Sequence, residues 1–115
     1  MSERDSNVAL AHMLTHAREA LAFVEQRSRE EAESDRLRWH GLVRLLEIVG
    51  EAASRVAPAV RARHPSIPWP SVVGMRNRLI HAYDAVDNDI VWKVLRIELP
   101  SLIKEIERAL AEERP

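Results

Sequence analysis

The sequence predicts an all-α fold, a bundle of four or five antiparallel helices, and three observations support this class. The helix-forming residues Ala, Leu, Glu and Arg are common, whereas the chain contains only three glycines. Apolar residues recur at steps of three and four along most of the chain, as they do on one face of a helix. No segment shows the alternation of apolar and polar residues that is typical of a half-buried strand. Helices with one apolar face bury it by packing as a bundle.

Length and composition restrict the possible functions. The 115 residues correspond to a single domain, 1–115, which is large enough to bury a hydrophobic core without disulfides or structural metals. The chain has no cysteine, which excludes disulfides and thiolate metal sites, and we expect neither a metal nor a cofactor. The net charge of −1 favours no class of partner. The charged N-terminus and the lack of a long apolar run predict a soluble, cytoplasmic protein without a membrane segment.

The first half of the chain predicts two long helices and a short turn between them. The first begins at Asp5 or Ser6 and runs to about Gln26, with an apolar face of Leu10, Leu14, Ala17, Leu21 and Val24. Its His12 and His16 have the spacing of a metal-binding pair, but no acidic ligand follows, so exposed polar histidines are expected. Ser28 and Glu31 form a capping box.

The second long helix begins at Ser34 or Asp35 and ends before Pro58. Its apolar face comprises Leu42, Leu45, Leu46, Val49, Ala52, Ala53 and Val56. Gly41 and Gly50 lie inside this helix, which predicts the close approach of another backbone. Glu47 and Glu51 lie one turn apart, and they either line a polar cleft or belong to a solvated face.

The second half of the chain predicts a connector and two further helices. A proline-rich connector, 58–68, leads to a helix that begins near Pro70 and includes residues 70–83. Gly74 inside it suggests tight packing, with Gly50 as a candidate partner. Asp87 caps a last helix, in which Pro100 predicts a kink or a break between Ile97 and Ser101.

The segment Met75–Tyr83 contains the residues best suited to chemistry. His81 can exchange a proton at neutral pH, and Arg76 can hold a phosphate through two parallel hydrogen bonds. Placed on one helix, the two residues lie roughly 140° apart, yet both could reach one anion at the helix end. Asn77 and Arg78 flank that edge as possible phosphate contacts, and Tyr83 follows the expected end of the helix.

This set suits the cleavage of RNA without a metal. The histidine would activate the ribose 2′-hydroxyl or protonate the leaving oxygen, and the arginine would stabilise charge on the phosphorane-like transition state. A single histidine cannot easily serve on both sides of the phosphorus, so the chemistry favours a symmetric dimer that brings two copies of His81 together. Alternatively, Arg76 forms an ion pair with Glu47 or Glu51, and His81 is a polar residue at a helix end.

The segment from Arg76 to Tyr83 resembles the Arg-x-x-x-x-His-x-Tyr motif of HepT-like proteins in the HEPN superfamily. Three further segments are similar to that family, in the same order along the chain, and together they extend the resemblance from about residue 8 to 110. They are Leu46-Glu47-Ile48-Val49-Gly50-Glu51-Ala52-Ala53, the run His64-Pro65-Ser66-Ile67-Pro68-Trp69 with Gly74, and Val86-Asp87 with Ile90-Val91-Trp92 and Leu99-Pro100.

The resemblance implies a HEPN-like helical bundle that forms a homodimer with both motif copies at a shared cleft. It implies a metal-independent endoribonuclease, the toxin of a toxin–antitoxin pair, with Arg76 and His81 catalytic. The antitoxin in that family is an MntA-like nucleotidyltransferase, which is thought to transfer AMP to the motif tyrosine, here Tyr83. An added phosphodiester there would repel RNA phosphates. Two other hypotheses remain: a non-catalytic helical module that binds a nucleotidyltransferase or a nucleotide, and a structural dimerisation unit.

Overall fold

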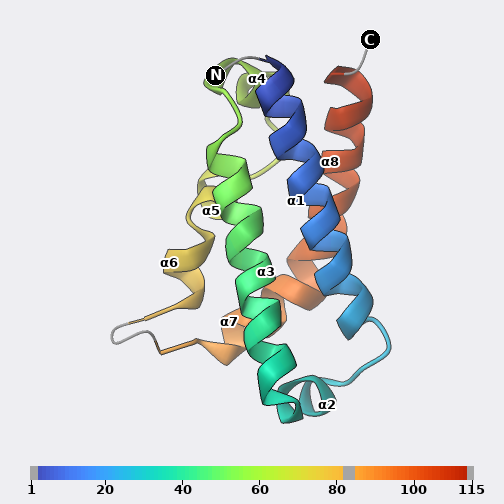
Figure 1. Cartoon of the computed structure of the whole chain (residues 1–115), viewed down its shortest axis with the longest axis vertical. Coiled ribbons are helices and arrows are strands. Elements are labelled where there is room, and N and C mark those ends of the chain that lie inside the picture. Colours follow the sequence, from blue (N-terminus) through green and yellow to red (C-terminus); the bar gives the residue numbers. More distant parts are fainter. Residues whose placement is uncertain (1–2, 82–84, 114–115) are drawn as a thin grey trace.

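The computed structural model describes residues 3–81 and 85–113, which form long helices with shorter ones between them (Figure 1). The long elements are α1 (Glu3–Val24), α3 (Arg36–Ser54) and a continuous helical run of α7 (Asn88–Lys93), η2 (Val94–Glu98) and α8 (Leu99–Glu113). The short helices are α2 (Arg29–Ser34), α4 (Pro58–Arg63), α5 (Trp69–Val73) and α6 (Met75–Leu79). The predicted all-α class is confirmed, and within the described ranges the extended pairing is one isolated bridge between Ile80 and Val86.

The core lies where α1 packs against both α3 and α8, with α5 and α6 covering the other side of α3 (Figure 1). The apolar positions predicted from helical spacing supply it, because each long helix turns one apolar face inward. Within the described part of the chain, no helix is both long enough and apolar enough to cross a membrane. Fully buried core residues include Leu10, Met13, Leu46, Val49, Leu79, Leu95, Leu99 and Ile106.

Three of the predicted helix caps are confirmed by hydrogen bonds, whereas the start expected at Asp5 or Ser6 is wrong, because both residues lie inside α1. The Ser28 hydroxyl accepts from the Glu31 backbone N–H at 3.1 Å, and the Glu31 carboxylate accepts from the Ser28 N–H at 2.9 Å, which completes the capping box. The Asp35 carboxylate caps α3 by accepting from the Arg38 N–H, and Asp87 caps α7 in the same way. Polar residues in the sequence therefore fix where three of the helices begin.

The prediction of one helix over residues 70–83 is wrong. Two short helices, α5 and α6, meet at Gly74, and α6 already ends at Leu79. Ile80 adopts extended backbone angles, φ −121° and ψ 125°, because its segment pairs with the strand-like residues around Val86. His81 therefore lies on an extended segment after the helix, and the angle expected between Arg76 and His81 on one helix does not apply.

Gly50 confirms the expected close approach, and Gly41 does not. A Cβ atom on Gly50 would lie 2.7 Å from the Val72 carbonyl oxygen and 2.9 Å from the Met75 Cβ. These contacts place the junction of α5 and α6 directly on α3. Among the described residues beyond the adjacent backbone of α3, none has an atom within 4 Å of the corresponding position on Gly41, so its place in α3 does not reflect packing. The sequence suggested Gly74 as the partner of Gly50, but the contacts come from the Val72 carbonyl oxygen and the Met75 side chain on either side of it.

Of the two effects expected at Pro100, a kink and a break, the structure shows a kink. The helix continues through Pro100, and the residues before it widen into the π-helix η2, where the Leu99 N–H donates to the Val94 carbonyl. Proline lacks an N–H and its ring crowds the carbonyl four residues earlier, so a wider turn relieves both problems. Figure 1 shows the helical run changing direction here, with α7 lying across the bundle and α8 along it.

Candidate active site

The candidate site lies at the end of α6, where that helix gives way to the extended segment that pairs with the residues before α7. Arg76 is on α6, and His81 follows the helix end by two residues. Both side chains are open to solvent, with 57% of Arg76 and 58% of His81 exposed. Tyr83, the expected modification site, lies outside the described residues. Two residues suited to acid–base and phosphate chemistry are thus accessible, one near the beginning of a short helix and one just after its end.

A small antiparallel bridge positions His81. The His81 N–H donates to the Ala85 carbonyl at 2.7 Å, and the Asp87 N–H donates to the Leu79 carbonyl at 2.8 Å, on either side of the pair Ile80–Val86. In such a ladder, His81 and Asp87 are diagonal neighbours on one face, within reach of each other. Their side chains meet: His81 Nε2 lies 2.9 Å from Asp87 Oδ2.

Asp87 belongs to the site through its contact with His81, a role that the sequence did not predict. Its carboxylate also accepts from the Ile90 N–H at 3.1 Å through Oδ1, as the cap of α7. The pKa of Asp87 is lowered from its ordinary value, first by the hydrogen bond with His81 and then by the Ile90 N–H, so the carboxylate is ionised at neutral pH. The sequence predicts Asp87 as a helix cap. Its contact with His81 depends on the bridge between Ile80 and Val86, and no local sequence pattern predicts that bridge.

Arg76 contacts Glu47 of α3, with Nη1 and Oε2 3.5 Å apart. Glu47 is largely buried, whereas Arg76 remains more than half exposed. The alternative in which Arg76 forms an ion pair with Glu47 or Glu51 is confirmed for Glu47, although Arg76 is not buried in that pair. A long, loose contact to one edge leaves guanidinium surface accessible, so Arg76 can be positioned by Glu47 and still meet an anion.

The flanking residues Asn77 and Arg78 lie differently from each other. Asn77 is exposed on α6. Arg78 forms a two-pronged ion pair with Glu98 of η2, with nitrogen–oxygen distances of 3.0 and 2.7 Å, and is only 28% exposed. Such a paired fork holds α6 against η2 and uses the hydrogen bonds that a phosphate would need.

The two glutamates of α3 face different surroundings. Glu47 lies toward α6 and Arg76, as described. Glu51 pairs with Arg44 at 2.9 Å and lines an open hollow of about 350 Å³ between α1 and α3, beside Asp5, Val8 and His12. Of the predicted cleft pair, Glu47 is the member that contacts the motif through Arg76.

A second hollow adjoins Asp87. Its volume is about 380 Å³, a size typical of ligand sites, and Val86 and Asn88, the neighbours of Asp87 in sequence, form one wall. Arg36 and His40 at the start of α3 contribute basic and polar groups to it. The floor is Trp39, whose indole N–H donates to the Asn88 side chain at 2.9 Å.

The described residues contain no group of three or more His, Asp or Glu side chains placed to hold a metal ion. The His12 and His16 pair does not serve as one: His16 Nδ1 lies 2.7 Å from the His12 backbone oxygen. The chemistry that this site offers is that of a solvent-accessible imidazole, an ionised carboxylate behind it and a guanidinium on the adjacent helix.

Comparison with known proteins identifies a family for this arrangement. Residues 13–109 match the family described as ribonuclease HepT-like. The chain is 33% identical to "Putative RNase MJ1380" of Methanocaldococcus jannaschii over 107 residues, covering 93% of this chain and 98% of that protein. It is 35% identical to "Probable ribonuclease HepT" of Thermococcus cleftensis over 94 residues, covering 78% and 86%. No solved structure matches the chain significantly.

Proposed function

The chain belongs to the ribonuclease HepT-like family, and we propose that it is a metal-independent endoribonuclease whose reacting residues are Arg76 and His81. The observation that carries this proposal is the exposed imidazole of His81, hydrogen-bonded to an ionised carboxylate, beyond the end of the helix that carries Arg76. An imidazole held in this way transfers protons at neutral pH, and a guanidinium nearby stabilises phosphate charge.

The proposed reaction is an internal transesterification of RNA. His81 takes the proton of a ribose 2′-hydroxyl, and that oxygen attacks the adjacent phosphorus. The bond from phosphorus to the 5′-oxygen breaks, which leaves a 2′,3′-cyclic phosphate and a 5′-hydroxyl. Arg76 stabilises the added negative charge on the phosphorane-like transition state. Asn77 is an exposed hydrogen-bonding group on the same helix. A role for Arg78 in phosphate binding requires that it exchange Glu98 for the substrate.

The 5′-oxygen needs a proton as it leaves, on the side of the phosphorus opposite the attacking 2′-oxygen. His81 acts as the base on the side of the 2′-oxygen, so another group must supply that proton. We infer that a homodimer supplies a second, protonated His81 from the other copy, as a two-fold axis through the site would allow. Exposure of His81 and Arg76 supports this arrangement, since both side chains are available at a surface.

The first test is RNA cleavage by purified protein in excess EDTA. We expect cleavage, with loss of at least about 100-fold in rate for His81→Ala, because proton transfer contributes that much or more. His16→Ala is the matched control, since His16 is a histidine of α1 bonded to its own helix. Cleavage at the wild-type rate by His81→Ala would overturn the assignment. No cleavage by wild-type protein, with tight binding of a nucleotidyltransferase, would favour the non-catalytic module.

We further propose that the protein is the toxin of a toxin–antitoxin pair. An MntA-like nucleotidyltransferase would neutralise it by forming a phosphodiester between the Tyr83 oxygen and AMP, with pyrophosphate leaving from ATP. This rests on the resemblance of residues 76–83 to the family motif, and on charge, because the added phosphodiester would repel RNA phosphates.

Intact mass after co-expression with such a nucleotidyltransferase tests this regulation. We expect a gain of one or more AMP units, loss of RNA cleavage in the modified protein, and no gain in Tyr83→Phe. An unchanged mass, or modification that persists in Tyr83→Phe, would contradict the assignment of Tyr83. Neither result would bear on the ribonuclease proposal, which the cleavage assay tests separately.

A further inference from the structure

We propose that Asp87 is a positioning residue that fixes which nitrogen of His81 reacts, so that Nδ1, and not Nε2, exchanges the proton with RNA. This inference rests on the proposed ribonuclease function and deepens it. It concerns a residue four positions beyond the motif tyrosine, at the start of a different helix, and the two groups are joined by the geometry of the Ile80–Val86 bridge.

The two oxygens of Asp87 have separate partners. Oδ1 accepts from the Ile90 N–H at 3.1 Å and caps α7, while Oδ2 lies 2.9 Å from His81 Nε2. The main chain of Asp87 is fixed as well, because its N–H donates to the Leu79 carbonyl at 2.8 Å. The carboxylate is therefore oriented by two backbone contacts before it meets the imidazole.

An ionised carboxylate can only accept hydrogen bonds. The nitrogen that faces it, Nε2, must then carry the hydrogen, and in neutral His81 the lone pair is left on Nδ1. After Nδ1 takes a proton from the 2′-hydroxyl, the adjacent negative charge stabilises the imidazolium. The same logic governs the aspartate behind the histidine of a serine-hydrolase triad, with the two ring nitrogens exchanged.

Capping alone does not account for the contact with His81. Asp35 caps α3 through one oxygen and places its other oxygen 3.5 Å from Arg38 on the same helix. Asp89, the other acidic residue at the start of α7, pairs with Arg29 at 2.6 Å and is largely exposed. Asp87 combines a cap with a contact across the bridge to the proposed reacting group, and its side chain is 27% exposed where that of His81 is 58% exposed.

The substitution Asp87→Asn tests the inference without removing the cap. The Ile90 N–H still requires an oxygen, which forces the amide nitrogen toward His81, and that nitrogen can only donate. Nε2 must then accept, and the hydrogen moves to Nδ1. We expect kcat for RNA cleavage to fall by about 100-fold or more, with KM changed less than about threefold and the melting temperature nearly unchanged. Asp35→Asn, the same change at a cap that touches no histidine, should retain wild-type kcat.

The tautomer itself is measured by long-range proton–nitrogen NMR at a pH where His81 is neutral, with its signals assigned through His81→Gln. We expect the hydrogen on Nε2 in the wild type and on Nδ1 in Asp87→Asn. Nδ1–H in the wild type, or wild-type kcat in Asp87→Asn, would overturn the inference. The NMR result does not require activity, so a wild-type protein that cuts no RNA but shows the expected tautomers would refute the ribonuclease proposal alone.

Discussion

Arg76 and Arg78 show how two identical residues, two positions apart, acquire different roles. Arg78 is bound through both arms by Glu98, and it joins α6 to η2. Arg76 contacts Glu47 at 3.5 Å and has a side chain that is more than half exposed. The residue with the more exposed guanidinium is the better candidate for binding a transferring phosphate, because a substrate can reach it from solvent.

Arg76→Lys tests whether the planar guanidinium is needed. Lysine keeps the charge and can still contact Glu47, but it lacks the rigid pair of donors that matches a phosphate. We expect RNA cleavage to slow by about 10- to 100-fold with little change in stability, as measured by initial rates and thermal unfolding. Arg44→Lys is the control, since Arg44 pairs with Glu51 on a surface away from the motif. Equal rates for Arg76→Lys and wild type would assign Arg76 a structural role.

The candidate residues and the contact of Arg76 with Glu47 could be predicted from the sequence, but the contact of His81 with Asp87 could not. Arg76 and His81 were identified by residue type and by the family motif, and both are exposed as their proposed chemistry requires. Asp87 was predicted as a helix cap, which the structure confirms, while its contact with His81 depends on a backbone bridge between residues six apart. Local propensities do not encode such a bridge, because tertiary packing decides where α6 ends.

At the level of elements, α6 is short and is held in place by neighbours on two sides. Gly50 lets the α5–α6 junction lie against α3, and the Arg78–Glu98 pair attaches α6 to η2. A five-residue helix has little stability of its own, so these contacts determine the position of Arg76.

Gly50→Ala tests the contact between α3 and the α5–α6 junction. The added methyl would lie 2.7 Å from the Val72 carbonyl oxygen, so backbone must move. We expect the free energy of unfolding to fall by about 1–3 kcal/mol, since overpacking outweighs the gain in helix propensity. Denaturation with urea measures it.

Gly41→Ala provides a control in the same helix. Its added methyl meets no atom within 4 Å from the described residues beyond the adjacent backbone of α3, so only the propensity gain of up to about 1 kcal/mol should remain. A Gly50→Ala protein as stable as wild type would contradict the close packing described.

The sequence predicted the long helices and failed where two elements compete for the same residues. The spacing of apolar residues identified α1, α3 and the C-terminal helical run, because each buries one face in the common core. It extended the third helix through residues 70–83, because Leu79 and Ile80 continue the apolar pattern. The pairing of Ile80 with Val86 offers those residues an alternative set of backbone hydrogen bonds, and sequence periodicity alone does not distinguish the two.

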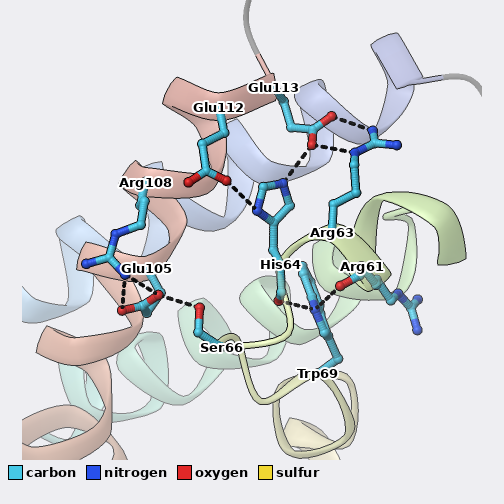
Figure 2. A network of polar contacts seen from close by, with 9 residues as sticks. All are labelled: Arg61, Arg63, His64, Ser66, Trp69, Glu105, Arg108, Glu112 and Glu113. Atoms are coloured by element: carbon cyan, nitrogen blue, oxygen red, sulfur yellow. Dashed lines mark hydrogen bonds and ion pairs between the residues drawn. The ribbon is translucent and has the colours of Figure 1, made fainter.

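On the scale of the whole molecule, a polar cluster joins the end of the bundle where α8 finishes to the connector before α5. Figure 2 shows His64 between the carboxylates of Glu112 and Glu113, with Arg63 on the far side of Glu113. His64 is only 6% exposed, and its carbonyl accepts from the Trp69 indole N–H at 3.0 Å. Arg63 also reaches Glu3, so the cluster ties α1, the connector and α8 together.

This cluster predicts a pH dependence of stability. Hydrogen bonds from Arg63, and then from His64, lower the pKa of Glu113 from 4.5 to about 2. A lowered pKa stabilises the folded state above the unfolded value, and the benefit is lost as pH falls from about 4.5 toward 2. We expect Glu113→Gln to lower the melting temperature at pH 6 and to have progressively less effect below pH 4.5.

Glu107→Gln is the matched control, because Glu107 pairs with Arg18 at an exposed position where an ion pair adds little. Its melting temperature should follow that of the wild type across the range. A Glu113→Gln effect that is constant from pH 6 to pH 2.5 would show that the lost contact is not linked to ionisation.

The π-helix η2 absorbs one residue of chain length between α7 and α8. A π-turn contains one residue more than the α-turn it replaces, so deleting one residue from Val94–Glu98 would leave a regular helix. Because a π-turn and an α-turn each complete one full turn, Asp87 at the start of α7 would keep nearly the same orientation relative to α8. We expect homologues that are one residue shorter in this segment to keep the carboxylate that faces the imidazole.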